Sequence, residues 1–95
     1  MRFSSEEANF LKKEISAILP DALIYLFGSR VDDSKKGGDI DIMVLSGRRL
    51  NWKEKSKFRW RYFDKYGEQK IDIVTFSFQE ENPFKQLIME KGVKL

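Results

Sequence analysis

Three aspartates lie in the most apolar short segments of this chain, where the surrounding residues predict buried strands. Asp39 and Asp41 alternate with isoleucine in the sequence DIDI, and Asp72 is the centre of a second Ile-Asp-Ile. Aspartate is normally depleted in strands. Strands of this composition constrain the fold, because each needs one face against a core and another face on which a carboxylate is tolerated.

The alternation within segment 39–45 places its acids on one face. Residues two apart in a strand project to the same side, about 6.5–7 Å apart, so Asp39 and Asp41 share a face with Met43. Carboxylates at this spacing repel one another unless a divalent cation lies between them. Asp72 completes a three-carboxylate metal site if its strand is a neighbour. The alternative is that all three are ordinary solvent-facing acids on half-exposed strands.

A turn of small residues precedes the acidic segment. The apolar run 22–27 predicts a buried strand, and Gly28-Ser29 ends it. Glycine lets a phosphate approach the backbone, the N–H groups of such a turn attract anions, and the Ser29 hydroxyl adds a donor. Arg30 follows, and it either contacts phosphate or braces the loop. The alternatives are a plain strand-ending turn and an ordinary surface arginine.

Residues that are missing exclude several chemistries. The chain has no cysteine and no histidine, which excludes disulfides, Ser-His-Asp and Cys-His catalysis, and zinc sites with histidine or thiolate ligands. A metal must therefore bind oxygen ligands, which favours magnesium, manganese or calcium. No apolar run is long enough to span a membrane and the N-terminus lacks a signal-peptide pattern, so we expect a cytoplasmic protein without membrane contact.

The pattern along all 95 residues predicts one domain, 1–95. A first helix begins with a capping box at Ser4 and ends at Pro20. The other predicted elements are strands at 22–27, 39–45 and 70–76, a helix at 52–66, and a last helix that begins at Asn82-Pro83 and ends at Gly92. This order predicts an α/β fold (α+β, two-layer) in which a small mixed sheet packs against helices.

A basic tract lies at residues 48–61, with seven Lys or Arg residues against the single acid Glu54. Trp52, Phe58 and Trp60 are interleaved with these cations. The tract can therefore contact nucleotide phosphates or nucleic acid. We favour the simpler interpretation, in which it is a solvated helix face whose aromatic residues lie in the core.

The turn Gly28-Ser29, nine intervening residues, the DID sequence that begins at Asp39, and a later strand with Asp72 form a compound pattern. This pattern resembles the nucleotidyltransferase superfamily related to DNA polymerase β. The Gly-Ser-Arg opening is most similar to the minimal nucleotidyltransferases (MNT) of bacteria and archaea. The three residues after Arg30 are VDD, where small family members often have ARG, so we assign no role there.

The resemblance implies roles for six residues: Gly28, Ser29 and Arg30 in nucleotide binding, and Asp39, Asp41 and Asp72 in catalysis and metal binding. The first two acids would hold two Mg²⁺ ions. The third would bind the metal beside the acceptor hydroxyl and help to deprotonate that hydroxyl. The implied reaction is attack of the hydroxyl on the α-phosphate of a nucleoside triphosphate, with ATP as the expected substrate.

The resemblance also implies a partner. Minimal family members act as the antitoxin half of toxin–antitoxin pairs, and add AMP to a tyrosine of a small all-helical, HEPN-like partner protein. We therefore expect a protein adenylyltransferase. One alternative is a non-catalytic nucleotide-binding module that neutralises its helical partner by contact. A further alternative is a nucleotidyltransferase directed at nucleic acid, which the basic tract suggests.

Overall fold

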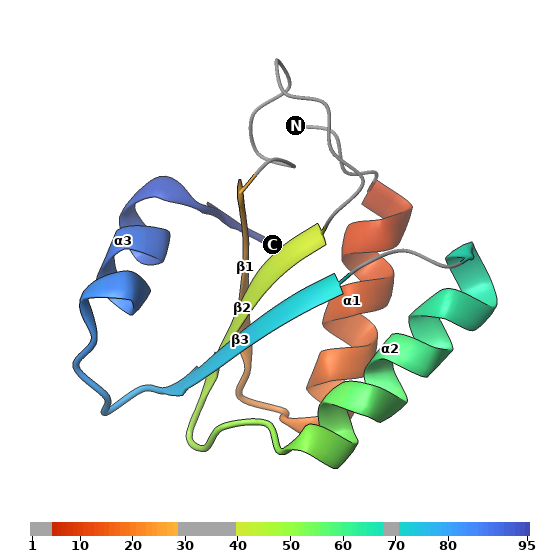
Figure 1. Cartoon of the computed structure of the whole chain (residues 1–95), viewed down its shortest axis with the longest axis horizontal. Coiled ribbons are helices and arrows are strands. Elements are labelled where there is room, and N and C mark those ends of the chain that lie inside the picture. The colour runs from red at the N-terminus through yellow and green to blue at the C-terminus, as the bar shows by residue number, and fades with distance from the viewer. Residues whose placement is uncertain (1–4, 29–39, 68–70) are drawn as a thin grey trace.

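The structure, a computed structural model, describes residues 5–28, 40–67 and 71–95 of the chain. Its elements in order are α1 (Ser5–Ile18), β1 (Leu23–Phe27), β2 (Ile40–Ser46), α2 (Trp52–Tyr66), β3 (Ile71–Ser77), α3 (Pro83–Lys91) and β4 (Val93–Lys94). α3 stands apart from α1 and α2, with the strands between them (Figure 1). The predicted α+β fold, a small mixed sheet packed against helices, is confirmed. No helix in these three ranges has the length and apolar character needed to cross a membrane.

The four strands form one sheet in the order β3-β2-β1-β4. β2 and β3 are parallel, whereas β1 pairs antiparallel with both β2 and β4. Three strands were predicted, so the sequence-based count was one too low. β4 is only two residues long, and Val93 pairs with Leu26. A pair of residues shows no periodicity, which is why the pattern did not reveal it.

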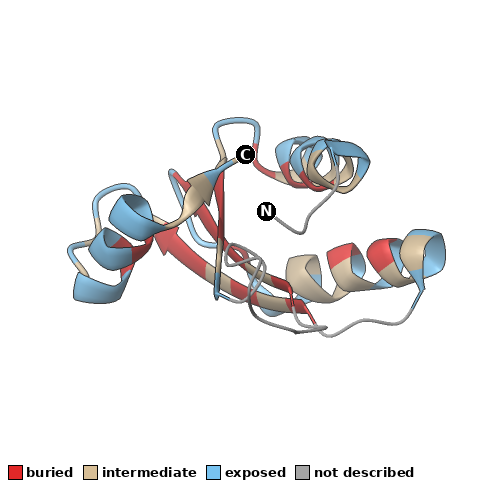
Figure 2. Ribbon diagram, turned by 90° about the horizontal axis from the view of Figure 1, so that it is seen from above, coloured by how far each residue is buried: buried red, intermediate tan, exposed pale blue. Residues whose placement is uncertain are grey.

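The two faces of the sheet bury different side chains, as the alternation in β2 predicts. Ile40, Ile42 and Val44 pack into a core with residues from α1 and α2. Met43 points to the opposite face, where a smaller core includes Ile88 of α3. Figure 2 shows buried residues along the strands and on the helix sides that face them. α1 and α2 therefore cover one face, and α3 covers part of the other.

Aromatic rings and polar contacts join α1 to α2. The Phe10 ring lies edge-on to Tyr62 and Tyr66, with ring centroids 5.9 and 5.5 Å apart. The Tyr62 hydroxyl also donates a hydrogen bond to the Glu7 carboxylate. Offset and edge-on aromatic pairs add stability beyond the area that they bury. These contacts hold the helical layer together above the larger core.

The helix α2 has the predicted bounds. Asn51 caps its N-terminus in a capping box with Glu54, in which each residue's side chain accepts a hydrogen bond from the other's backbone N–H. Phe58 is buried, as expected for a core aromatic. The prediction that the other interleaved aromatics lie in the core is wrong, because Trp52 and Trp60 are 71% and 74% exposed. Both lie on the side of α2 that faces away from the sheet.

The helix α3 begins as predicted, with Asn82 as N-cap and Pro83 in the first turn. Its end at Gly92 has a physical reason that the sequence did not show. A Cβ on Gly92 would lie 2.7 Å from the carbonyl oxygen of Ile88 and 2.9 Å from that of Leu26. Glycine is therefore needed because helix and strand backbones approach closely, and the φ of −80° is ordinary.

Candidate active site

The C-terminal end of β1 and the N-terminal ends of β2 and β3 lie side by side at one end of the sheet. Because β1 runs antiparallel to β2, its last residue lies beside the beginning of β2, and Phe27 pairs with Asp41. Because β3 runs parallel to β2, its beginning lies on the other side, and Asp41 pairs with Asp72. Gly28 follows Phe27 directly. The topology therefore brings Gly28, Asp41 and Asp72 together, although they are far apart in the sequence.

Asp41 and Asp72 are direct neighbours across two parallel strands. Neighbouring strands lie about 4.8 Å apart, and paired residues project to the same face. Both residues are half-buried. They face the side of the sheet that carries the smaller core, opposite α1 and α2. Like charges in paired positions repel, so this arrangement favours a cation at the edge of the sheet.

Gly28 lies against one of these carboxylates. A Cβ built on it would lie 2.3 Å from Oδ2 of Asp41, so an added methyl group would force that carboxylate to move. Its φ of +78° also lies in the region that favours glycine. Two independent constraints thus require glycine here. The missing side chain lets the Asp41 carboxylate lie directly against the turn.

Three predicted site residues, Ser29, Arg30 and Asp39, lie outside the described residues. Their proposed contacts with nucleotide and metal therefore stay predictions. Within the ranges 5–28, 40–67 and 71–95, no group of three or more potential metal ligands occurs. The described part of the site is the pair Asp41 and Asp72 with Gly28 beside it.

The described donor set fits a hard divalent cation. Asp41 and Asp72 offer carboxylate oxygens from adjacent strands on the same face. The chain has no thiolate or imidazole that would select zinc or copper. Magnesium prefers one or two carboxylates together with water and substrate phosphates. Asp41 and Asp72 are therefore the residues that would hold Mg²⁺ in the described part of the site.

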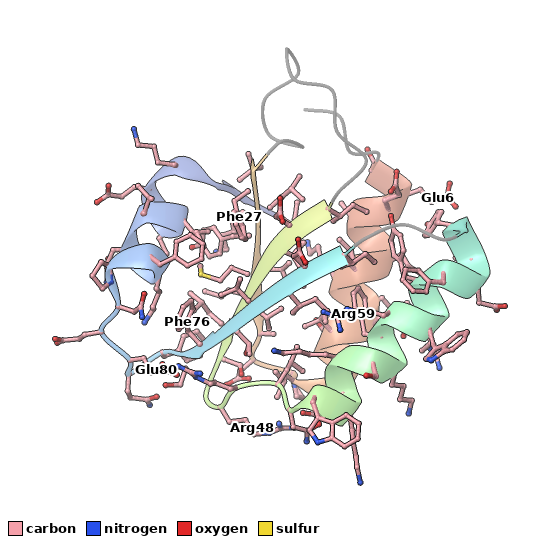
Figure 3. The ribbon with its side chains drawn as sticks, in the orientation of Figure 1. Glu6, Phe27, Arg48, Arg59, Phe76 and Glu80 are labelled. Carbon is pink, nitrogen blue, oxygen red and sulfur yellow. The ribbon has the colours of Figure 1, made fainter. Side chains whose placement is uncertain are left out.

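Arg59 fixes the strand that carries Asp72. It extends from α2 toward β3 (Figure 3), and its Nε donates a hydrogen bond of 3.2 Å to the carbonyl oxygen of Ile71. Ile71 directly precedes Asp72, so this contact anchors the backbone next to the carboxylate. The basic tract contains Arg59, but its alternating charges gave no signal that distinguished this residue from its neighbours.

A shallow apolar pocket of about 260 Å³ opens beside Gly28. Its walls come from the end of β1 and from α3: Phe27, Gly28, Phe84, Leu87, Ile88, Lys91 and Gly92. The rings of Phe27 and Phe84 meet edge-on, with centroids 5.7 Å apart. Figure 3 shows Phe27 between β2 and α3. Sequence reasoning missed this pocket because it depends on how α3 folds back onto β1.

The candidate site is therefore a glycine turn against paired strand carboxylates on a mixed sheet. Residues 9–95 match the family described as "Polymerase beta, Nucleotidyltransferase". The chain belongs to this family and is a minimal nucleotidyltransferase of the polymerase β-like superfamily. It is also similar to a Haemophilus influenzae protein named "Probable protein adenylyltransferase MntA", with 25% identity over 85 residues, which cover 88% of this chain and 74% of that protein.

Proposed function

We propose that this nucleotidyltransferase uses ATP and Mg²⁺ to transfer AMP to a hydroxyl, most specifically to a tyrosine of a helical partner protein. The observation that carries the proposal is the convergence of Gly28, Asp41 and Asp72 at one edge of the sheet. The similarity to a protein named as an adenylyltransferase supports a protein acceptor. The antitoxin role in a toxin–antitoxin pair, expected from the resemblance, belongs to the same proposal.

The proposed reaction is a single in-line displacement. The acceptor oxygen forms a bond to the α-phosphorus of ATP, and the bond from that phosphorus to the oxygen bridging to the β-phosphate breaks. Pyrophosphate leaves with the electron pair, and the hydroxyl proton passes to the Asp72 carboxylate and then to water. Bound Mg²⁺ supplies charge neutralisation and lowers the pKa of the attacking hydroxyl. The absence of a Cβ at Gly28 allows the Asp41 carboxylate to lie beside the turn that would bind the phosphates.

The apolar pocket beside Gly28 is suited to the nucleoside part of the substrate. Its walls are almost entirely apolar, and the edge-on pair Phe27 and Phe84 lines it. Flat aromatic rings such as a nucleobase pack well against such surfaces. The exposed Lys91 lies at the same pocket and would face the negative charge of the nucleotide.

α3 also offers the apolar surface that a protein acceptor requires. Phe84 and Leu87, which lie on one side of α3, are 44% and 50% exposed. Exposed apolar side chains that gather on one element favour a protein interface. Since α3 borders the pocket beside Gly28, a partner that docks there would present its hydroxyl near the carboxylates.

The proposal is tested by incubating the protein with the partner encoded beside it, Mg²⁺ and each nucleoside triphosphate in turn. Intact masses are then measured. We expect one added AMP on the partner with ATP, absent for Asp41→Asn and retained for Asp64→Asn, which alters an exposed acid of α2.

Two other results would each support a different function. A tight complex with unchanged mass in the presence of every nucleotide would favour the binding module that neutralises its partner by contact. Transfer to added RNA, but not to the protein, would favour the nucleotidyltransferase directed at nucleic acid.

A further inference from the structure

Positive charge is concentrated on one helix. The chain has 18 basic and 15 acidic residues, and α2 alone holds six basic and two acidic ones. The other elements and loops together therefore contain slightly more acids than bases. α2 forms an outer edge of the molecule, on the side away from α3 (Figure 1), and packs on the sheet face opposite Asp41 and Asp72. Apart from Arg59, which contacts the backbone beside Asp72, this charge is thus separate from the candidate active site.

Both tryptophans of the chain lie on this helix, and both are exposed. The exposed fractions are 71% for Trp52 and 74% for Trp60. An eight-residue separation in an α-helix corresponds to about 12 Å along the axis and about 80° around it, so the two indoles share one side. Lys53 and Lys57 are exposed and fall on the same side. Two large aromatic side chains are therefore presented to solvent among cations, and Nζ of Lys53 lies 5.7 Å from the centre of the Trp52 ring.

Two acids near this side are already paired, and the exposed Asp64 lies one turn beyond Trp60 on the same side of α2. Glu54 accepts two hydrogen bonds of 2.8 Å from Arg48. The carboxylate of Glu14 in α1 pairs with Arg61. Within the described ranges, Lys53 and Lys57 form no salt bridge. Their charges are available to an anionic ligand.

The chemistry of this surface favours nucleic acid over protein. α2 contains no aliphatic residue in any of its fifteen positions. Protein interfaces have an apolar centre that is depleted in lysine, whereas here lysines lie between the indoles. Single-stranded nucleic acid instead combines bases that stack on aromatic rings with phosphates that need cations.

We propose that the exposed side of α2 binds single-stranded nucleic acid. Trp52 and Trp60 stack on unpaired bases, and Lys53 and Lys57 neutralise the phosphates of the same strand. Paired bases are already stacked inside a duplex, so the surface discriminates against double strands. This surface acts independently of the nucleotidyl transfer proposed above.

The two tryptophans make the test direct, because they are the only ones in the chain. Tryptophan emission is followed while oligouridylate, oligodeoxythymidylate, the matching duplex, or heparin is added. We expect the single strands to quench the emission at low salt, with affinity that falls steeply as salt rises. Heparin has charges but no bases, so it should compete for the surface without quenching.

Variants separate stacking from charge. Trp60→Ala should weaken binding of the single strand about tenfold, because stacking contributes about 1–3 kcal/mol per base. Lys57→Gln should reduce the salt dependence by about one phosphate contact. The exposed Lys94 lies on the edge strand β4, at the opposite edge of the sheet from β3, so Lys94→Gln should bind as the parent does. Far-ultraviolet circular dichroism confirms that each variant is folded.

Three results would overturn the proposal. The first is unchanged emission with every single strand at low salt. The second is equal affinity for single and double strands that Trp60→Ala does not alter. The third is a blue shift of the emission on addition of the partner protein, with no quenching by oligonucleotide, which would assign this surface to protein binding.

Discussion

Among the described residues, the two glycines with positive φ differ in what surrounds them. Gly28 has a φ of +78°, and its missing side chain leaves room for Oδ2 of Asp41. Gly67 has a φ of +87° and ends α2, but a Cβ there would meet nothing within 4 Å. A substitution is therefore strained at both positions. Only at Gly28 does an added methyl group displace a carboxylate of the candidate site.

Gly28→Ala and Gly67→Ala form a matched pair. We expect both to lower stability by about 1–3 kcal/mol, since each forces an alanine into a sparsely populated conformation. We expect Gly28→Ala alone to lower the rate of AMP transfer by about a hundredfold, because displacement of a catalytic group by about 1 Å has effects of this size. Thermal melts and the mass assay measure the two effects. Equal transfer rates for the two variants would contradict the role assigned to Gly28.

At the scale of elements, a buried lysine holds the connection between β3 and α3. Lys85 is 5% exposed. Its Nζ donates hydrogen bonds to three backbone carbonyl oxygens, of Ser77 at 3.2 Å, Phe78 at 3.0 Å and Glu80 at 2.8 Å. An ammonium group has three donors, and all three are used. The loop therefore folds around the lysine, and α3 begins at a fixed position.

Lys85→Met keeps the apolar stem of the side chain and removes the donors. Hydrogen bonds to a charged group each contribute about 1.5–3 kcal/mol, but the freed carbonyls regain some water contacts. We expect the free energy of unfolding to fall by about 2 kcal/mol in urea titration. Lys91→Met, at an exposed position of the same helix, should leave it nearly unchanged. Equal stability of the two variants would refute the structural role of Lys85.

Two carboxylates at the ends of elements make stability depend on pH. Hydrogen bonds from Arg48 and from a backbone N–H lower the pKa of Glu54 to about 2. Arg49 and a backbone N–H do the same for Glu80. Glutamate in an unfolded chain titrates near about 4.3. The contribution of Glu54 and Glu80 to the free energy of unfolding is therefore complete above about pH 4.3. It is lost as the pH falls toward about 2.

Replacing both acids by glutamine removes this dependence. In Glu54→Gln/Glu80→Gln, we expect the free energy of unfolding to fall less between about pH 5 and pH 3 than in the parent. Urea titrations at a series of pH values measure the slope. Glu90→Gln, at an exposed position of α3, serves as the control. A slope identical to the parent's in the double variant would contradict the assigned pairs.

At the scale of the whole molecule, the sheet divides two cores of unequal size. Among the described residues, thirteen buried side chains form the core beneath α1 and α2, and five form the core beneath α3. Local opening requires less free energy where fewer apolar contacts are lost. α3, which borders the pocket beside Gly28, is therefore the helix held most weakly by apolar packing.

This difference predicts the order of hydrogen exchange. Backbone amides of α3 should exchange faster than those in the middle of α1, measured by mass spectrometry after proteolysis. Ile88→Ala removes a residue of the smaller core that is 2% exposed, and should accelerate exchange in α3 while leaving α1 nearly unchanged. Equal acceleration in both helices would show that the molecule opens only as one unit.

Local patterns predicted most elements but not their contacts. Alternation in β2 gave the correct faces because one face of the strand lies against a helix layer, and the capping residue before α3 was visible as sequence. Asp41 and Asp72 are adjacent because β3 pairs with β2. The sequence alone did not show which strands pair. The exposure of Trp52 and Trp60 was predicted wrongly, because hydrophobic type alone does not show which face of a helix meets the sheet.

The most direct test of the central claim is the binding of Mn²⁺, which stands in for Mg²⁺ on oxygen ligands. Electron paramagnetic resonance measures free Mn²⁺ as protein is added. We predict that the parent and the surface variant Asp64→Asn bind Mn²⁺ equally, and that Asp41→Asn and Asp72→Asn each bind it at least about tenfold more weakly. Equal Mn²⁺ affinity in all four proteins would show that the paired carboxylates do not share a metal.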